Sequence, residues 1–446
     1  MRNISILGTT SDAGKSTLTF IIGRILQNFG FSVAPFKAQN VSNNAKVADD
    51  GSEISIAQYF QAEVLGVPTS YHINPVLLKS GRASSASLIV EGKVVADRDV
   101  REYYRELDSL KPAVKRAFNY LNDKYDIVVA EGAGSPVELN LMDKDLANIF
   151  IADEFDTGVI LVADIEKGGV FASIYGVYHL LPEKIRNNII GVIVNKFRGD
   201  MTLFDEGIEI IEKRFGIPVL GVLPYIPLNL GFEDSQSLMN YAHKAKSDAK
   251  RIAVIAYPTM SNYNDLEPLI ADENISLEFV KGNIPLNSFD EIILPGSKLV
   301  IKDLRWLKST GLFQQLREIS VPITGICGGY QMMFKYIDDC VGIETNPPAV
   351  EEALGFIDDT VVFRKEKILK KDTYEIFGKK VKGFEMHHGI SEKYPISFDN
   401  GKIRGTFVHS LFDDEKFEKC KKKTVDKFVE TMTGYINTDL IYNYVR

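Results

Sequence analysis

Short, continuously apolar runs separated by helical stretches recur along the 446-residue chain. Continuous apolar strands are typical of a parallel sheet whose two faces are both covered by helices. In the first half these runs fall at 4–7, 32–35, 126–130, 158–162, 191–194 and 219–222, and a helix is expected from Ser16 to about Phe29. After a polar, charged linker at 233–250, the pattern restarts at 251–256, 291–294 and 322–326. We therefore expect an α/β protein of two doubly wound domains, 1–235 and 250–446.

The bulk composition limits the kinds of partner that the chain can bind. The formal net charge is −8, whereas binding to nucleic acid phosphates needs clustered positive charge. The one basic cluster, Lys419 to Lys423, is expected on the solvated face of a terminal helix. No apolar run approaches the roughly 18 residues of a membrane span. We therefore expect no nucleic acid and no membrane partner.

Three cysteines, Cys327, Cys340 and Cys420, are spread over the second half of the chain. None belongs to a C-x-x-C pair, which argues against a zinc site and against a redox dithiol. A sparse, odd number of cysteines is typical of a reducing compartment, and the N-terminus lacks the apolar segment of a signal peptide. We expect a cytoplasmic protein.

The stretch G-T-T-S-D-A-G-K-S, from Gly8 to Ser16, joins the first expected strand to the first expected helix. It is similar to the phosphate loop G-x-x-x-x-G-K-[ST], except that Thr9 holds the usual position of the first glycine. Backbone N–H groups at such a junction attract an anion. We expect Lys15 to reach the β- and γ-phosphates of ATP and Ser16 to bind Mg²⁺. The ATP-binding residues predicted in this stretch are Thr10, Gly14, Lys15, Ser16 and Thr17; the alternative is an ordinary strand–helix turn.

Polar residues after other strands are expected in the same crevice, because open α/β sheets bind ligands at the carboxyl ends of their strands. Glu131 ends the run V-V-A-E and is a predicted magnesium ligand. Asp50, in A-D-D-G, is another, with Asp49 as its competitor and a simple turn as the alternative. Lys37 is predicted to neutralise a transferring phosphoryl group. Asn195 is predicted to bind the adenine edge, with a strand-end turn as the alternative.

The stretch G-I-C-G-G, around Cys327, has the form of a nucleophile elbow with sulfur in place of serine oxygen. It follows an expected strand and precedes an expected helix over Y-Q-M-M-F-K. A thiol nucleophile needs a base. His409 ends the apolar run G-T-F-V-H and is the predicted base, with His387 and His388 as its rivals. Cys340 and Cys420 lack such a setting.

Two glycines and a glutamine complete the second predicted site. Gly296, in L-P-G-S-K, ends the strand before the elbow, and its N–H is predicted to pair with that of Gly328 as an oxyanion hole. Gln331 lies one helical turn beyond Cys327. Its side-chain amide is predicted to hold another amide.

These residues carry a resemblance to known families. G-I-C-G-G-Y-Q and G-T-F-V-H resemble a class I glutamine amidotransferase domain, which implies a flavodoxin-like second domain. There the cysteine attacks the glutamine side-chain amide, forms a thioester and releases ammonia. That class usually has a glutamate two residues after the histidine, where this chain has Leu411. The resemblance therefore implies a Cys–His dyad and leaves open what orients His409.

The first domain resembles the dethiobiotin synthetase-like ATPases, in which the early glycine of G-T-x-[ST]-x-x-G-K-[ST] is normal. The two halves in this order resemble the cobyric acid synthase group along nearly the whole chain. The matching runs include P-F-K-A-Q-N, I-N-P-V-L-L-K, E-G-A-G-S-P-V-E-L-N, V-N-K-F-R-G-D and F-E-M-H-H-G. Ser410 departs from that group, which usually has glycine at this position.

The resemblance implies a ligase that amidates the b, d, e and g carboxylates of adenosylcobyrinic acid a,c-diamide in cobalamin biosynthesis. It would use ATP, Mg²⁺ and glutamine, with an acyl phosphate as intermediate. Cobyrinic acid a,c-diamide synthase, or a related ligase on another acceptor such as a cell-wall lipid, is the alternative. A P-loop switch of the partitioning ATPase type, with a second domain that only binds, is a further one. A homodimer remains one option for the assembly.

Overall fold

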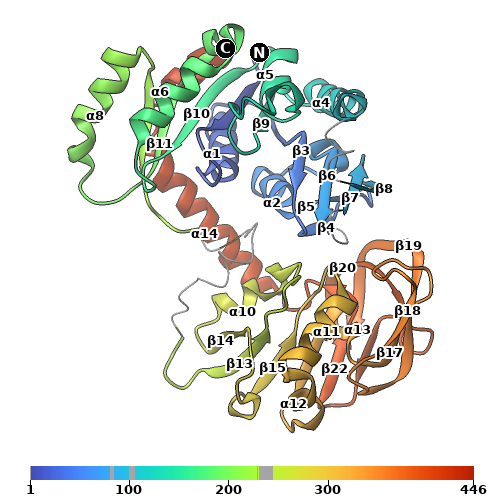
Figure 1. Ribbon diagram of the computed structural model, residues 1–446. Helices are drawn as coiled ribbons and strands as arrows, with labels where there is room; N and C mark the ends of the chain where they lie inside the picture. Colours follow the sequence, from blue (N-terminus) through green and yellow to red (C-terminus); the bar gives the residue numbers. More distant parts are fainter. Residues whose placement is uncertain (1, 81–84, 100–105, 229, 231–244) are drawn as a thin grey trace. The chain divides into compact units, whose positions relative to one another are not determined.

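The structure of the protein, a computed structural model, describes residues 2–80, 85–99, 106–228, 230 and 245–446. The chain forms two compact units (Figure 1). The first unit comprises residues 1–41, 57–228 and 421–446, and the second comprises 42–56 and 229–420. Most of the predicted linker 233–250, namely 233–244, lies outside the described residues.

The first unit is built on a six-stranded parallel sheet in the order β12-β11-β10-β1-β9-β2. Its strands are β1 (Ile4–Gly8), β2 (Val33–Phe36), β9 (Ile127–Glu131), β10 (Gly158–Asp164), β11 (Ile189–Phe197) and β12 (Val219–Pro224). Each overlaps one of the apolar runs singled out in the sequence, and β2 and β9 begin one residue later than expected. The prediction of a parallel sheet buried on both faces is confirmed for this unit.

Helices and a small second sheet cover the central sheet of the first unit. The helices are α1 (Lys15–Asn28), α2 (Ile56–Leu65), α4 (Lys111–Lys124), α5 (Ile149–Glu154), α6 (Val170–Leu180), α7 (Glu183–Asn187), α8 (Asp205–Glu209), residues 421–433 of α14 (Glu415–Thr433) and α15 (Thr438–Val445), with a π-helical turn at Ile210–Phe215. The small sheet has the order β3-β6-β7-β8: Gln39–Val41, Val76–Ser80, Ser85–Val90 and Lys93–Asp99.

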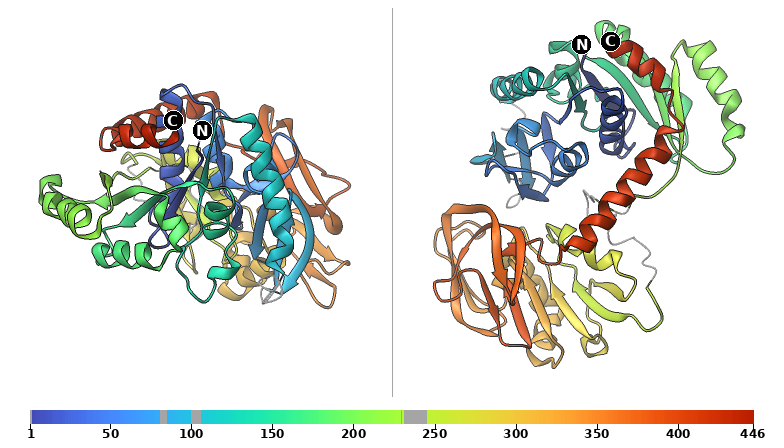
Figure 2. Two further views of the ribbon diagram at one scale, coloured as in Figure 1. Left: turned by 90° about the horizontal axis from the view of Figure 1, so that it is seen from above. Right: turned by 180° about the vertical axis from the view of Figure 1, so that it is seen from behind.

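Two apolar clusters hold these layers of the first unit together. One joins β2 and β9 to α2, α4 and α5, and the other joins β10, β11 and β12 to α6 and α7. The two ends of the chain lie side by side in this unit, where the Arg2 N–H donates to the Val445 carbonyl oxygen at 3.4 Å (Figure 2). The apolar strands are buried between helices, which holds the strand ends in place. The loops that follow the strands are therefore held in place as well.

The second unit contains a parallel sheet in the order β14-β13-β15-β16-β22, with β21 antiparallel at its edge. The strands are β13 (Lys250–Ile255), β14 (Ile275–Val280), β15 (Glu291–Leu294), β16 (Ile323–Ile326), β21 (Ser397–Asp399) and β22 (Ile403–Thr406). Its helices are α10 (Glu267–Ala271), α11 (Val300–Thr310), α12 (Leu312–Glu318) and α13 (Gly328–Gln331). The parallel strands follow the flavodoxin-like order, as expected.

A mixed sheet in the order β18-β17-β19-β20-β23 completes the second unit. Its strands are β17 (Phe334–Asp339), β18 (Ala349–Glu352), β19 (Ile357–Ile376), β20 (Lys379–Ile390) and β23 (Val408–His409). The predicted helix over Y-Q-M-M-F-K is wrong beyond Gln331, because α13 ends there and β17 begins at Phe334. Phe334 and Ile337 bury their side chains from this strand, so burial and sheet pairing override the expected helix.

The compact units differ from the predicted boundaries 1–235 and 250–446 in two segments. Residues 42–56, which form a hairpin of β4 (Ala45–Val47) and β5 (Glu53–Ser55), belong to the second unit. Residues 421–446 belong to the first. There Arg24 pairs with Asp426 at 2.9 Å and Lys421 with Glu63 at 2.9 Å. A linear reading of the sequence assigns each segment to its neighbours, whereas long-range contacts decide where it packs.

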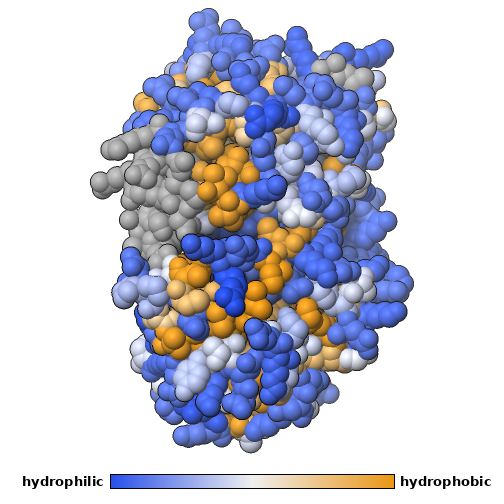
Figure 3. All heavy atoms as spheres, turned by 90° about the vertical axis from the view of Figure 1, so that its right-hand side faces the viewer, coloured by the Kyte–Doolittle hydropathy of each residue, from blue (hydrophilic) through white to orange (hydrophobic). Residues whose placement is uncertain are grey.

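Hydrophilic residues predominate on the face drawn in Figure 3. In the face drawn in Figure 3, hydrophobic residues form separate groups among hydrophilic ones, which is ordinary for a globular protein. Among the described residues, no helix is both long enough and apolar enough to span a bilayer.

Candidate active sites

In the first unit, the loop after β1 wraps around the side chain of Lys15. Lys15 is buried, and its Nζ donates to the carbonyl oxygens of Gly134 at 2.8 Å and Thr10 at 3.3 Å. Gly14 takes a φ of 102°, which glycine adopts without strain, and precedes the first helical residue. A side chain at Gly8 would collide with Lys15 Nζ, 2.8 Å from an ideal Cβ. Glycine at position 8 therefore leaves space for the side chain of Lys15.

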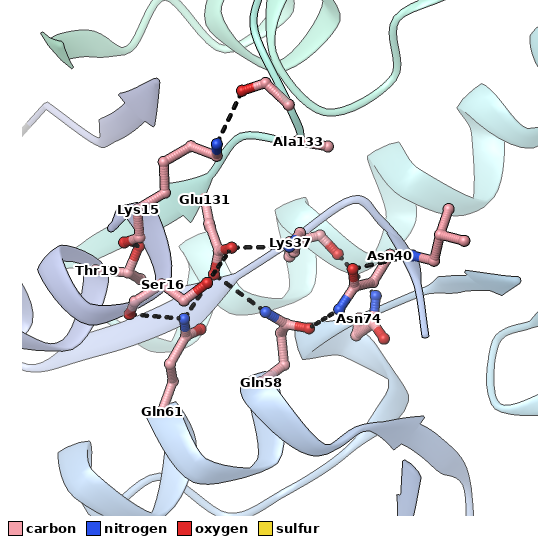
Figure 4. Close-up of polar contacts among 12 residues, drawn as sticks. Lys15, Ser16, Thr19, Lys37, Asn40, Gln58, Gln61, Asn74, Glu131 and Ala133 are labelled. Atoms are coloured by element: carbon pink, nitrogen blue, oxygen red, sulfur yellow. Dashed lines mark hydrogen bonds and ion pairs between the residues drawn. The ribbon is translucent and has the colours of Figure 1, made fainter. Parts of the chain in front are cut away.

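Glu131, at the end of β9, is the centre of a buried polar network (Figure 4). Its Oε1 accepts from Ser16 Oγ at 2.7 Å and from Lys37 Nζ at 2.8 Å. Its Oε2 accepts from Gln61 Nε2 at 2.6 Å and Gln58 Nε2 at 3.1 Å. The structure thus brings together three residues predicted from the sequence, Ser16, Lys37 and Glu131, from three separate segments.

Burial and charge act in opposite directions on Glu131. Burial acts to raise the pKa of its carboxyl group, but the Lys37 charge and hydrogen bonds from Lys37, Ser16 and Gln61 more than offset it, so the pKa lies below its usual value. The carboxylate stays ionised at neutral pH. Gln58 and Gln61 were missed by the sequence reasoning. Both lie on α2 at a spacing of three residues, which places them on one helix face.

The other residues predicted for this site have varied surroundings. Asn195, on β11, donates from Nδ2 to the Ala13 carbonyl oxygen at 2.8 Å and so lies against the phosphate loop. Thr17 is half-buried in the first turn of α1. Buried hydroxyl oxygens of Thr9 and Thr10 have no hydrogen-bond partner among the described residues, and such atoms fit a site that receives a polar ligand.

Asp50 lies in the second unit, in the turn between β4 and β5. Its Oδ1 accepts from the Ser52 N–H at 3.0 Å and from Ser52 Oγ at 2.5 Å, which is the geometry of a turn residue. Asp49, its competitor in the sequence, pairs with Lys371 at 2.6 Å. The described residues include no cluster of three or more metal-ligating His, Cys, Asp or Glu side chains. A metal-binding role of Asp50 stays a prediction.

In the second unit, Cys327 occupies a strained turn between β16 and α13. Its φ of 48° and ψ of −103° are unusual for a residue with a Cβ, and its N–H donates to the Thr406 carbonyl oxygen at 2.8 Å. An ideal Cβ on Gly325 would lie 2.7 Å from Met333 Sδ, and one on Gly329 would collide with the Leu294 backbone. The flanking glycines are therefore required by close packing, as in a nucleophile elbow.

His409, at the end of β23, adjoins Cys327. Burial acts to lower the pKa of its imidazole, but the charges of Asp265 and Cys327, and hydrogen bonds to both, outweigh burial and raise it to about 10. The ring is buried and stacks on Phe384, with centroids 4.9 Å apart. The imidazole thus lies where a base for a thiol nucleophile has to lie.

Asp265 takes the place of the absent glutamate at position 411. Its Oδ2 lies 2.7 Å from His409 Nδ1, and its Oδ1 accepts from the Ser410 N–H at 2.7 Å. The sequence reasoning missed this residue, which sits in the 3₁₀ turn Tyr263–Leu266. One local signal marks it in the sequence: the polar run S-N-Y-N-D at 261–265, which lies a few residues after the end of β13.

The rival histidines face other groups. His387 approaches Glu385 through Nε2 at 3.1 Å and the Gly389 carbonyl oxygen through Nδ1 at 2.7 Å. His388 Nδ1 lies 3.0 Å from the Arg364 carbonyl oxygen, and burial lowers its pKa to about 4. Of the three, His409 is therefore the one that the structure joins to Cys327.

The remaining predicted residues also lie close to the elbow. An ideal Cβ on Gly328 would be 2.5 Å from the Ser297 nitrogen, and one on Gly296 would be 3.3 Å from His409 Cε1. Both backbones thus approach the Cys–His pair. Gln331 is buried, and its Oε1 has no hydrogen-bond partner among the described residues.

Comparison with known proteins agrees with this division of sites. Residues 4–230 match the model of the CobQ/CobB/MinD/ParA nucleotide binding domain, and residues 251–417 match that of the CobB/CobQ-like glutamine amidotransferase domain. Fold and sites therefore define a glutamine amidotransferase joined to a nucleotide-binding domain.

Sequence identity to curated proteins shows which family within this class the chain belongs to. The cobyric acid synthase of Acinetobacter baylyi is 58% identical over 463 aligned positions, which cover 100% of both chains. That of Clostridium kluyveri is 39% identical over 95% of this chain and 90% of its own. A probable cobyric acid synthase of Methanosarcina barkeri is 40% identical over 93% of this chain and 89% of its own. The chain belongs to the cobyric acid synthase family.

Proposed function

We propose that the protein is a cobyric acid synthase that amidates the b, d, e and g carboxylates of adenosylcobyrinic acid a,c-diamide, with ATP and glutamine as co-substrates. The observation that carries this proposal is the 58% identity to a cobyric acid synthase across the full length of both chains. The two candidate sites supply the two half-reactions that such a ligase needs. The cytoplasmic location and a homodimer, expected from the sequence, remain predictions.

The first unit would activate the corrin carboxylate. The carboxylate oxygen attacks the γ-phosphorus of ATP, the bond to the β–γ bridging oxygen breaks, and ADP leaves an acyl phosphate. Lys15 and Lys37 would stabilise the negative charge on the transferring phosphoryl group. Thr10, Gly14 and Thr17 would bind the phosphates, and Asn195 the adenine edge. Ammonia then attacks the acyl carbon and expels phosphate to give the amide.

Mg²⁺ fits the oxygen atoms that this unit presents. Ser16 Oγ and Glu131 Oε1 lie 2.7 Å apart, and the Glu131 carboxylate is ionised. Protein sites for Mg²⁺ usually supply one or two carboxylates, and phosphates and waters complete the shell. Ser16 and Glu131 would hold the ion. Asp50, predicted as a further ligand, belongs to the second unit. The chemical contribution of Mg²⁺ would be to neutralise phosphate charge.

The second unit would release ammonia from glutamine. Cys327 Sγ attacks the side-chain carbonyl carbon, and the N–H groups of Gly296 and Gly328 would stabilise the oxyanion. His409 gives its proton to the departing nitrogen, the C–N bond breaks, and a thioester remains. Neutral His409 then takes a proton from water, which attacks the thioester and releases glutamate. Asp265 orients His409 throughout, and Gln331 would bind the substrate amide.

Mass spectrometry tests the reaction and the acceptor together. Protein incubated with ATP, glutamine and adenosylcobyrinic acid a,c-diamide should give four successive losses of one mass unit, each replacing OH by NH₂. Two losses from the earlier, unamidated corrin would favour cobyrinic acid a,c-diamide synthase instead. The variant Cys327→Ala should lose amidation with glutamine and keep it with ammonium salts. Survival of glutamine-dependent turnover in this variant would contradict the thioester route.

A further inference from the structure

The hairpin of β4 and β5 comes from the nucleotide-binding stretch of the sequence but packs within the second unit. Residues 42–56 fall inside the match to the nucleotide-binding domain, 4–230, and yet they group with the amidotransferase residues. Strand β4 lies against β19 and β20. Glu53, whose side chain is fully buried, pairs with Lys367 at 2.6 Å. The hairpin is thus anchored to the sheet that carries Met386, whose carbonyl oxygen lies 3.7 Å from Cys327 Sγ.

Asn44, at the start of the hairpin, bridges to the loop that carries Asp265. Its Oδ1 accepts from the Asn262 N–H at 2.8 Å, and its Nδ2 donates to Tyr263 Oη at 2.8 Å. Asn44 is 5% exposed. Asn262 has a left-handed φ of 52°, a conformation that asparagine tolerates better than most residues. The side chain of Asn44 therefore binds two consecutive residues of a strained turn.

The same hairpin fixes which way the Asn262 amide faces. The Ala45 N–H donates to Asn262 Oδ1 at 3.1 Å, and because a backbone N–H can only donate, the oxygen must lie on that side. Asn262 Nδ2 then faces His409 Nε2 at 3.3 Å. An amide N–H at this position can donate only to an unprotonated Nε2, and the remaining ring proton is then on Nδ1, opposite Asp265.

We propose that Asn44 is a positioning residue for glutamine hydrolysis: the hairpin holds Asn262 so that its Nδ2 stabilises His409 as a neutral base. This inference rests on the proposed role of Cys327 and His409. Stabilisation of neutral His409 matters once the thioester has formed. At that stage the sulfur no longer carries a negative charge that favours the imidazolium form. Water can then be activated only by a neutral Nε2, and Asn262 offsets the opposite influence of Asp265.

The variant Asn44→Ala tests the proposal. It should lower kcat for glutamate release by roughly tenfold or more. KM for glutamine should stay nearly unchanged, because Asn44 acts on His409 through Asn262 and Tyr263. The acid limb of the kcat–pH profile should also move to higher pH, since loss of the aligned N–H donor raises the pKa of His409. Amidation with ammonium salts should be unchanged, which shows that the first unit is folded, and the unchanged KM for glutamine shows that the second unit is.

Two further variants make the result specific. Asn44→Asp keeps an oxygen for the Asn262 N–H and offers the other to the Tyr263 hydroxyl, so at its own pH optimum it should recover most of the wild-type kcat. Asn400→Ala removes an asparagine of the same unit that also accepts backbone N–H groups, those of Lys402 and Ile403, and should leave kcat and the pH profile unchanged.

The outcomes separate this inference from the proposed function. An Asn44→Ala variant with normal kcat, or with a uniform loss of kcat and no shift of the acid limb, would overturn the positioning role. So would an equal loss in Asn44→Asp. A wild-type chain that releases no glutamate would overturn the proposed function and the inference together.

Discussion

Asp265 Oδ2 lies 2.7 Å from His409 Nδ1, while its Oδ1 accepts from the N–H of the next residue, Ser410. One carboxylate thus fixes both the ring and the backbone at the end of β23. Leu411 stands where the class usually has its glutamate. The acidic partner of the histidine comes instead from a turn far earlier in the chain, before the cysteine. The side chains follow the order Asp, Cys, His along the sequence.

Replacement of Asp265 should disable glutamine hydrolysis selectively. In Asp265→Asn the amide cannot stabilise an imidazolium or hold the Nδ1–H tautomer, so kcat for glutamate release should fall by about 10²–10⁴-fold. Amidation with ammonium salts should persist, because the first unit is unchanged. The control Asp399→Asn alters a turn carboxylate of the same unit that accepts from the Gly401 N–H. Equal rates of glutamate release in both variants would contradict a role for Asp265.

The departure of Ser410 from the family glycine has a backbone cause. Its φ is 66°, in the left-handed region that costs a residue with a Cβ about 1–2 kcal/mol. Ser410→Gly should therefore raise the free energy of unfolding by up to about 1 kcal/mol, after the greater chain entropy of glycine is counted. Ser397→Gly, at an extended strand position, should lower it instead. Thermal or urea denaturation of both variants provides the measurement, and a loss of stability in Ser410→Gly would refute the strain.

Local sequence patterns predicted most of the parallel strands, because those strands are continuous apolar runs. The patterns missed β14 (I-S-L-E-F-V) and β22 (I-R-G-T), in which polar residues interrupt the apolar ones. The long hairpin of β19 and β20 could not be found in this way. Its residues include F-R-K-E-K-I-L-K-K-D, with many exposed charged side chains, and pairing between the two strands defines it. The predicted helix after Cys327 failed for a related reason, since burial of Phe334 in β17 outweighed local helix preference.

The same difference between local patterns and long-range contacts decides which site residues could be predicted. Lys15, Ser16 and Cys327 lie in compact motifs whose glycines and strand–helix junctions can be read directly. Asp265 and Asn44 belong to no such motif, and each acts through a residue more than a hundred positions away. Their roles depend on a left-handed turn at Asn262 and on a hairpin that joins the second unit. A single sequence shows neither of these.

Glu344 should make the second unit sensitive to pH. Its carboxylate accepts from the N–H groups of Val300 and Ile301 at the start of α11, at 2.9 and 2.8 Å. Burial nevertheless raises its pKa to about 7. A carboxyl group with a raised pKa in the folded state binds its proton more tightly there than in the unfolded chain. Stability is therefore lost as pH rises from the unfolded value of about 4.3 through 7.

The variant Glu344→Gln isolates this effect. Between pH 5 and 8 the stability of the wild type should fall by about 2 kcal/mol more than that of the variant, because only the wild type has to ionise a buried group. Urea denaturation of both proteins at the two pH values measures the difference. Parallel pH profiles would mean that Glu344 ionises as easily in the folded state as in the unfolded chain.

Glu131 should be needed by the first unit and not by the second. In Glu131→Gln the buried ammonium group of Lys37 loses its charged partner, which typically costs about 3–5 kcal/mol when an ion pair is this well buried. Amidation should then fail with glutamine and with ammonium salts alike, whereas glutamate release should continue.

Lys37→Met combined with Glu131→Gln should recover much of the lost stability without recovering amidation, because the double variant leaves no buried charge without a partner. Glu209→Gln, which breaks the exposed pair with Lys213, should change stability by less than about 1 kcal/mol. If Glu131→Gln amidates at the wild-type rate, this carboxylate has no role in the phosphate site.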